Sequence, residues 1–211
     1  MSKHDTQHSP EPVASGLWQP EPEHPDSIGL RTLGFWLYMM SDAMIFAGLF
    51  AAHGVYLRAY GGSDITAAEV IDPAKGLIPT LLLFTSVLAF GLASVALKND
   101  DRSRMLRWMG ASWILGLAFL GEEVWEFSGL AGEDAVPQAS AFLSDFWTIV
   151  WVHGAHVAVG LIWMAAMLVQ IAREGYTEAT VGRFLNLRIF WFFQAVIWVF
   201  VYTFVYLMGV S

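Results

Sequence analysis

The chain contains no cysteine, and unusually few of its residues carry a charge. None of its 211 residues is Cys, and 14% are Asp, Glu, Lys or Arg, whereas a typical water-soluble domain has about 25%. The missing cysteines exclude disulfide, thiolate and iron–sulfur chemistry within this chain. The shortage of charge, with 56% apolar residues and a mean hydropathy of +0.51, indicates an integral membrane protein.

Five apolar segments are each long enough to cross a bilayer. They cover residues 30–57, 77–97, 105–127, 146–172 and 189–210. At about 1.5 Å per residue, a helix of each length would span the roughly 30 Å hydrocarbon core. The segments do not alternate between polar and apolar residues, as the strands of a membrane barrel would. We therefore expect an all-α integral membrane protein, with residues 30–211 forming a bundle of five transmembrane helices.

The basic residues near the ends of these segments predict how the chain is oriented. Nine Lys and Arg residues lie before or at the very start of the first segment, or where the chain leaves the second and fourth segments and enters the next one, whereas Arg58 and Lys75 lie on the opposite side. The positive-inside rule then predicts a cytoplasmic N-terminus and a periplasmic C-terminus. Residues 1–29 are rich in Pro, His and Glu, so we expect a disordered cytoplasmic tail without the pattern of a secretory signal.

Asp42 stands out because no other Asp, Glu, Lys or Arg lies between Thr32 and Leu57. An ionised residue at mid-membrane costs about 2.5 to 3.5 kcal/mol on insertion scales, so such residues face a protein interior and often mark proton or ion pathways. Two interpretations remain open: a proton-linked carboxylate, or a buried acid hydrogen-bonded to a residue such as Ser41. Burial favours the neutral form in both.

Two further polar groups lie near the outer ends of the third and fourth segments. Glu126 shares a helix face with Glu122 and Glu123. Because neighbouring carboxylates repel one another, a shared proton, a basic partner or a bound cation is expected there. His153 and His156 are three residues apart and point the same way. If the two helices are antiparallel neighbours, the carboxylates and imidazoles are at similar depth and could form one cluster.

This Glu/His cluster has three interpretations on the sequence alone. Carboxylates and imidazoles on bundle helices build di-iron centres, but those sites favour Glu-x-x-His on one helix, and here the two residue types are segregated. A second interpretation is that His153 or His156 ligates a haem, although nothing else in the sequence shapes a haem pocket. The third interpretation, which the segregation favours, is a hydrogen-bonded polar brace.

Several separate motifs resemble subunit III of the haem-copper terminal oxidases, in the right order and at the right spacing from about Leu33 to Gly209. They are Gly34–Asp42 (GFWLYMMSD), Glu123-x-x-Glu126-Phe127, His153-Gly154-x-His156 followed by Gly160-Leu161-Ile162-Trp163, and Val205–Gly209. Within that family the chain is similar to the five-helix form found in bacterial cytochrome o (bo-type) ubiquinol oxidases.

The resemblance implies a non-catalytic subunit of a proton-pumping ubiquinol oxidase in a bacterial inner membrane. The chain would carry no haem, copper or catalytic residue. It would contact subunit I, which holds the haems and copper and reduces oxygen to water, together with subunits II and IV and structural phospholipids. No nucleic acid is expected among its partners. Subunit III is thought to sustain proton uptake and to protect the complex from inactivation during turnover.

The resemblance also assigns roles by position. Asp42 matches the intramembrane carboxylate known for modification by a carbodiimide, which requires a protonated acid in an apolar site. Glu123 and Glu126 match the family's E-x-x-E, and His153 and His156 match its H-G-x-H. Glu122 is an additional acid with no counterpart in the motif.

One departure from the family pattern lies in the last segment. The family usually has Trp-His-Phe-x-Asp, whereas this chain has Trp191, Phe192, Phe193, Gln194 and Ala195. The joint loss of His and Asp suggests that a buried polar pair has been replaced by apolar residues as a unit, which can be nearly neutral for stability. Gln194 would then make a different contact.

Other functions remain open on the sequence. The chain could be subunit III of a cytochrome c oxidase, or an accessory subunit of a nitric oxide reductase. It could also be a stand-alone proton-coupled transporter or a small metalloprotein that uses Asp42 and the Glu/His cluster. The last four segments contain no proline near mid-membrane, and no internal repeat is visible. These features argue against a transporter, because transporters usually show broken helices or inverted repeats.

Overall fold

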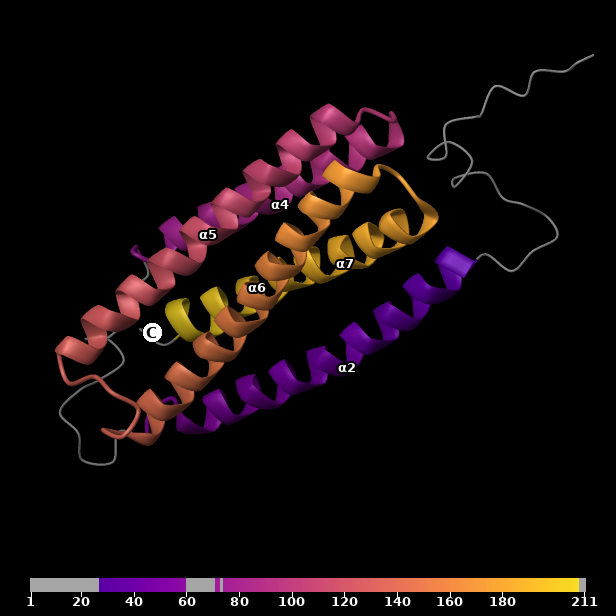
Figure 1. Ribbon diagram of the computed structural model, residues 1–211. Helices are drawn as coiled ribbons and strands as arrows, with labels where there is room; N and C mark the ends of the chain where they lie inside the picture. Colours follow the sequence, from indigo (N-terminus) through magenta and orange to yellow (C-terminus); the bar gives the residue numbers. More distant parts are fainter. Residues whose placement is uncertain (1–26, 60–70, 73, 209–211) are drawn as a thin grey trace, which may run out of the picture.

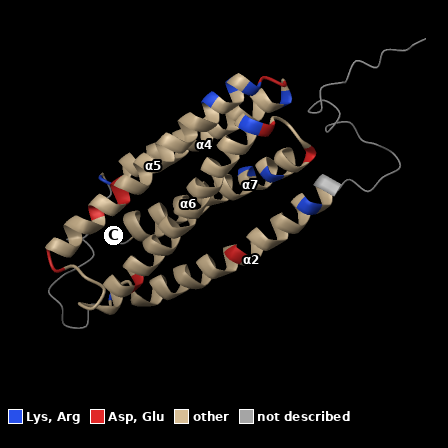
Figure 2. Ribbon diagram, viewed as in Figure 1, with Lys and Arg blue, Asp and Glu red and all other residues tan. Residues whose placement is uncertain are grey.

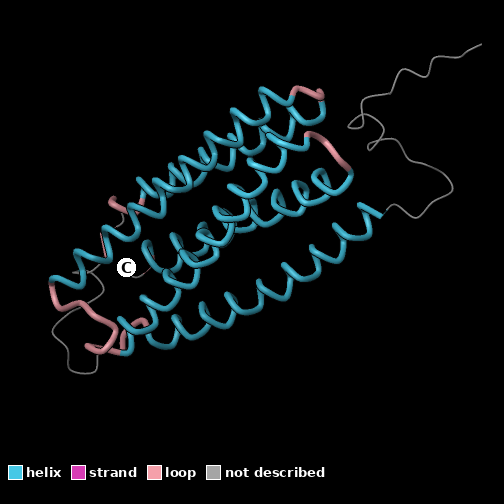
Figure 3. Tube along the Cα trace, viewed as in Figure 1, coloured by secondary structure: helices cyan, strands magenta, loops and turns pink. Residues whose placement is uncertain are grey.

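Five long helices form the bundle in the computed structural model, which describes residues 27–59, 71–72 and 74–208 (Figures 1 and 3). They are α2 (Ser27–Tyr56), α4 (Leu77–Lys98), α5 (Arg102–Gly132), α6 (Ala141–Glu174) and α7 (Glu178–Phe200), which continues as the π-helix η1 (Val201–Leu207). The described residues contain no strand. The predicted all-helical fold is therefore confirmed. Most of the predicted disordered tail, residues 1–26, lies outside the described residues.

Four of the helices are long and apolar enough to cross a membrane. These segments are Gly29–Tyr56, Leu77–Lys98, Ala141–Glu174 and Glu178–Leu207. Helix α5 is of similar length, with 31 residues. Its apolar stretch is shorter, because Arg107 and three glutamates lie inside the segment that the sequence predicted to cross the membrane. Four membrane-crossing helices thus follow from length and composition, and α5 differs from them in its charge.

The helices α6 and α7 begin well before the predicted segments, because polar residues cap them outside the apolar stretches. Ser140 Oγ accepts a hydrogen bond from the Leu143 N–H at 3.1 Å and so caps α6. Thr177 and Thr180 form a reciprocal capping box at the start of α7. Such caps satisfy backbone N–H groups that have no partner within the helix. As a consequence Asp145, which the sequence assigned to the outer loop, lies within α6.

The helices are arranged so that α6 and α7 lie between α2 on one edge and the α4–α5 pair on the other (Figure 1). Most Lys and Arg residues gather at one end of the bundle, where α4 leads into α5 and α6 leads into α7 (Figure 2). Tyr176 lies in the turn between α6 and α7 at that end. Burial raises the pKa of its phenol to about 12, and the nearby Asp100 and Asp101 act in the same direction. Its side chain is therefore neutral at physiological pH.

Trp191 of α7 joins three other helices at the centre of the bundle. Its fully buried indole lies in a slot between Gly116 of α5 and Gly160 of α6, where an added Cβ would come within 2.9 Å of the indole from either side. The indole Nε1 donates to Ser86 Oγ on α4 at 3.1 Å, and Ser86 in turn donates to the Ser112 carbonyl at 2.8 Å. Both glycines are therefore required by close packing and not by backbone conformation.

The last turns of the final helix widen into a π-helix, which the sequence did not predict. In η1 the side chain of Tyr206 is fully buried, and its ring lies against Gly76, where an added Cβ would be 3.0 Å away. The Tyr206 hydroxyl donates to Glu126 Oε2 at 3.3 Å. Short π-helical turns occur often at functional positions, and this one directs a phenol toward the glutamates of α5.

Candidate functional site

Asp42 lies in the middle of α2 and is paired with a histidine of α6. Its side chain is almost fully buried, and its Oδ1 atom is 3.3 Å from Nε2 of His156. The sequence left Ser41 open as a hydrogen-bond partner, but the Ser41 hydroxyl donates to the Leu37 carbonyl of its own helix at 3.3 Å. The intramembrane acid therefore has a partner on another helix that can itself bind a proton.

The hydrogen bonds of His156 determine how this pair can hold a proton. Its Nδ1 atom lies 2.7 Å from the Val152 carbonyl, and a carbonyl can only accept, so Nδ1 carries a hydrogen. When the imidazole is neutral, Nε2 is an acceptor and Asp42 must donate to it as a carboxylic acid. When the proton has crossed, an imidazolium donates to a carboxylate. The two forms have the same total charge and differ only in which side chain carries the proton.

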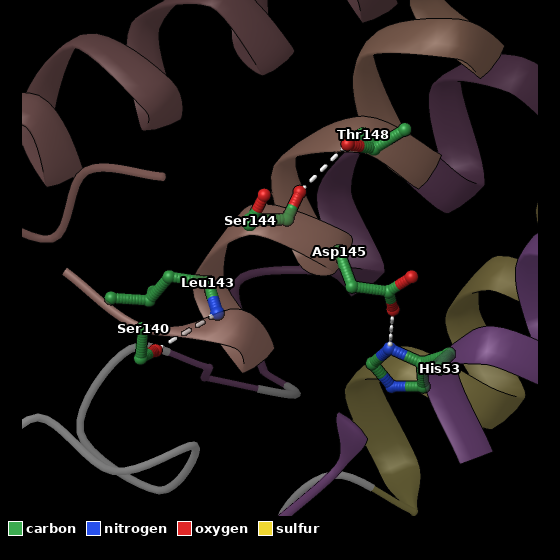
Figure 4. A network of polar contacts seen from close by, with 6 residues as sticks. All are labelled: His53, Ser140, Leu143, Ser144, Asp145 and Thr148. Atoms are coloured by element: carbon green, nitrogen blue, oxygen red, sulfur yellow. Dashed lines mark hydrogen bonds and ion pairs between the residues drawn. The ribbon is translucent and has the colours of Figure 1, made fainter. Parts of the chain in front are cut away.

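A second acid–imidazole pair joins the same two helices nearer the end of the bundle where α6 begins. His53 Nδ1 lies 2.7 Å from Asp145 Oδ2, with side-chain exposures of 3% and 7% (Figure 4). The sequence did not predict this pair, because His53 is not counted among the fixed charges of the first segment and Asp145 falls just before the fourth segment. Two signals could have revealed it: a histidine in an apolar segment, and a helix-capping Ser140 ahead of the aspartate.

The two pairs show the register of α2 against α6. Asp42 and His53 are eleven residues apart on α2, and Asp145 and His156 are eleven residues apart on α6, which is about 16 Å along a helix. The helices are therefore antiparallel, and the residue types are reversed: α2 supplies the acid to one pair and the imidazole to the other. Phe46 is buried between the two levels, with its ring 5.3 Å from that of His156.

His153 faces away from this pair although it is only three residues from His156. It is completely buried, and its Nε2 donates to the backbone carbonyl of Gln194 on α7 at 3.1 Å. The rings of Phe119 and Trp198 lie against it at centroid distances of 5.8 and 5.2 Å. Thus His153 contacts α7, whereas His156 contacts α2. The two imidazoles serve different helix contacts and do not point at a common ligand.

The three glutamates of α5 stay apart from the histidines. Glu126 accepts a hydrogen bond from Tyr206, Glu122 is half-buried, and Glu123 is 4% exposed with neither oxygen hydrogen-bonded within the described chain. No hydrogen bond or ion pair joins a glutamate of α5 to His153 or His156. The carboxylates and the imidazoles that the sequence grouped together thus have different hydrogen-bond and ion-pair partners among the described residues.

A metal-binding interpretation of these residues finds no suitable geometry. Among residues 27–59, 71–72 and 74–208, no three His, Asp or Glu side chains come close enough together to hold a metal ion. The imidazole of His153 is enclosed by aromatic rings, and that of His156 is paired with Asp42. Within the described ranges His153 and His156 instead contact protein groups on neighbouring helices.

The two positions that depart from the family pattern in the last segment differ in burial within this chain. Ala195 is buried, whereas Phe192 is 41% exposed and lies beside Gly91 of α4. Gln194 contributes its backbone carbonyl to His153, while its fully buried side-chain amide has no hydrogen-bond partner within the described residues.

Comparison with known proteins agrees with the motifs and the fold. The family model for cytochrome c oxidase subunit III matches residues 16–210. Subunit 3 of the cytochrome bo(3) ubiquinol oxidase of Pseudomonas aeruginosa is 38% identical over 184 residues, which cover 87% of this chain and 88% of that protein. Cytochrome c oxidase subunit 3 of Bacillus subtilis is 37% identical over 193 residues, covering 89% and 93%. A probable quinol oxidase subunit 3 of Staphylococcus epidermidis is 33% identical over 185 residues, covering 85% and 90%.

The chain belongs to the cytochrome c oxidase subunit III family, the third subunits of haem-copper oxidases. Family membership implies association with an oxidase complex. It also agrees with a multi-pass membrane protein whose helices are long and apolar.

Proposed function

We propose that the chain is the non-catalytic subunit III of a proton-pumping ubiquinol oxidase, and that the Asp42–His156 pair is its functional centre. The observation that carries the second part is the 3.3 Å contact between these residues inside an apolar segment. Chemistry on oxygen takes place in the partner subunit I, which holds the haems and copper. This chain supports subunit I, and it supplies a group that holds a proton next to the site of proton uptake.

The pair is suited to proton holding because both of its forms are neutral overall. A lone carboxylate in an apolar region would be costly, and so would a lone imidazolium. Proton transfer between Asp42 and His156 avoids both costs. The His156 side chain is 27% exposed, whereas that of Asp42 is 8% exposed. The imidazole is therefore the member through which a proton enters or leaves, and the acid is the member that stores it.

The remaining features of the assembly belong to the same proposal. All five long helices cross a bacterial inner membrane, with the N-terminus in the cytoplasm and the C-terminus in the periplasm. The clustering of Lys and Arg at one end of the bundle supports this orientation (Figure 2). Subunits I, II and IV are its partners, and phospholipids cover part of its surface.

Two electron donors deserve comparison. The similarity to the ubiquinol oxidase subunit of Pseudomonas aeruginosa, 38% against 37% for the cytochrome c oxidase subunit of Bacillus subtilis, supports ubiquinol only slightly. Cytochrome c is thus the second candidate. The difference lies in the partner subunits, since the donor does not bind to this chain in either proposal.

A stand-alone transporter or metalloprotein has less support. Asp42 is paired with His156 through Oδ1, and its Oδ2 atom has no hydrogen-bond partner among the described residues. Membership of a subunit family also accounts for the chain without an activity of its own. If the chain is instead an accessory subunit of a nitric oxide reductase, the contacts within it are the same. That alternative is recognised by the haem protein that copurifies with the chain.

Purification of the native complex through a tag on the chain tests the proposal. We expect copurified haem in the reduced-minus-oxidised spectrum and oxygen uptake driven by ubiquinol. If only reduced cytochrome c drives oxygen uptake, the electron donor is cytochrome c instead of ubiquinol, and the assignment of the chain as subunit III still holds. A haem-free chain with transport or metal-dependent activity of its own would overturn the proposal.

A further inference from the structure

An apolar groove of about 220 Å³ runs along the outer surface of the bundle between α5 and α6. Small residues of α6 form its floor: Gly154, Ala155 and Ala158. An added Cβ at Gly154 would meet nothing closer than a Leu120 methyl at 3.8 Å, so the groove is open there. The spacing Gly154-x-x-x-Ala158 is the small-xxx-small pattern that lets a second membrane helix approach closely.

Glu123 lies in this groove with an unsatisfied carboxyl group. The side chain is 4% exposed, and neither oxygen forms a hydrogen bond within the described chain. The groups facing it are Glu122 and Glu126 on its own helix and Tyr206 from η1, whose hydroxyl donates to Glu126. A buried polar group without a partner is costly and needs an explanation. No residue within 27–59, 71–72 and 74–208 supplies the missing partner.

The depth of Glu123 in the membrane distinguishes a lipid chain from a polypeptide helix as the occupant of the groove. It lies nine residues before the end of α5 at Gly132, and thus about 13 Å from the helix end. With the 31-residue helix centred on a hydrocarbon core of about 30 Å, its Cα lies about 6 Å inside the outer edge. A lipid chain at that depth offers only methylene groups. A polypeptide helix can present a hydroxyl, amide, imidazole or amine.

We propose that the α5–α6 groove is the docking site for a transmembrane helix of another subunit of the oxidase, whose hydrogen-bonding side chain pairs with Glu123. The proposal rests on the function proposed above, because it requires that the chain is part of a multisubunit oxidase. The helix crosses over Gly154 and Ala158 and covers the exposed faces of Val124 and Trp151 at the groove rim. The occupant is a peptide helix with a polar residue at this depth.

Photo-crosslinking in the intact complex tests the occupant directly. Trp151→benzoylphenylalanine places the probe at the groove, where the native residue is already aromatic and 54% exposed. Leu81→benzoylphenylalanine on α4, at a 66% exposed position, is the control. We expect irradiation of the complex to join this chain to another subunit of the same oxidase through the groove probe only. Mass spectrometry should map the adduct to a transmembrane segment with a polar residue. Adducts with lipid alone would overturn the proposal.

Substitutions in the groove provide a second test that does not need the probe. Glu123→Leu removes the hydrogen-bonding group, Glu123→Gln keeps one, and Ala155→Leu fills the groove. Ala47→Leu, at an exposed position of α2, is the matched control for the last change. Interhelical hydrogen bonds in membranes are worth about 0.6 kcal/mol on average, which corresponds to about threefold in an equilibrium constant.

The measured quantity is the amount of the crosslinked subunit that copurifies per copy of this chain. We expect Glu123→Leu and Ala155→Leu to lower it about threefold or more, with Glu123→Gln and Ala47→Leu close to the wild type. Unchanged retention in both groove variants would overturn the proposal. If the wild-type chain copurifies with no haem, the proposed function fails; if haem copurifies and only lipid is crosslinked, the docking inference alone fails.

Discussion

The His53 Nδ1 atom lies 2.7 Å from Asp145 Oδ2, and this buried contact joins the last turn of α2 to the beginning of α6. Together with Asp42 and His156 it gives the α2–α6 interface two acid–imidazole pairs in opposite order. The His53–Asp145 pair, called the outer pair because it lies nearer the end of the bundle, holds the helices in register. The Asp42–His156 pair, the inner pair, lies in the middle of α2, where a charge is least tolerated. Different consequences follow for substitutions in the two pairs.

Removal of one member of the outer pair should destabilise the protein. For Asp145→Leu we expect a loss of about 1 to 3 kcal/mol in the free energy of unfolding, because His53 is left buried without its partner. The double variant His53→Leu with Asp145→Leu should recover most of this loss, since both polar groups are then absent. Unfolding of the purified chain in SDS, followed by tryptophan fluorescence, measures both. A double variant that is less stable than the single one would contradict this account of the pair.

The slot around Trp191 should be intolerant of a single methyl group. Gly160→Ala puts a Cβ within 2.9 Å of the indole, so we expect a loss of about 1 to 3 kcal/mol from overpacking. Gly121→Ala is the control, because no atom lies within 4 Å of the added Cβ and alanine favours a helix over glycine by about 1 kcal/mol. The same unfolding measurement should move in opposite directions for the two variants. Equal effects would show that the slot is not tight.

Four of the five long helices were predictable because their apolar composition alone requires them, and α5 was predicted from a segment that also contains charged residues. Their limits were less so, since the predicted segments followed hydropathy and the helices continue to caps such as Ser140 and Thr177. The first helix also begins at Ser27, three residues before the apolar segment starts. Polar capping residues are visible in the sequence, and giving them more weight would have brought Asp145 into a helix.

The sequence shows which residues are candidates for the site more readily than it shows which side chain each of them contacts. Asp42 stood out from composition, but its pairing with His156, over a hundred residues further along the chain, depends on the register of two helices. Helical spacing predicted that His153 and His156 point the same way, but the angle between their positions on α6 directs His153 to α7 and His156 to α2. Spacing within one helix cannot specify which neighbour each side chain meets.

Carbodiimide modification tests the protonation of Asp42. The reagent needs a protonated acid in an apolar site, and the neutral form of the Asp42–His156 pair provides one. We expect labelling of intact membranes to map by mass spectrometry to the α2 peptide, and Asp42→Asn to abolish it there. The α5 peptide with Glu123 serves as an internal comparison. An unlabelled α2 peptide in the wild type would show that Asp42 is ionised or inaccessible.

The most direct measurement of the central claim is the number of turnovers that the purified oxidase completes before it loses activity. The account predicts that Asp42→Asn keeps the haem content and shortens this lifetime severalfold, because the amide cannot store the proton. His156→Gln should act in the same direction, whereas Glu122→Gln on the partly exposed face of α5 should match the wild type. A wild-type lifetime in Asp42→Asn, or a loss of haem from the complex, would contradict the role assigned to the pair.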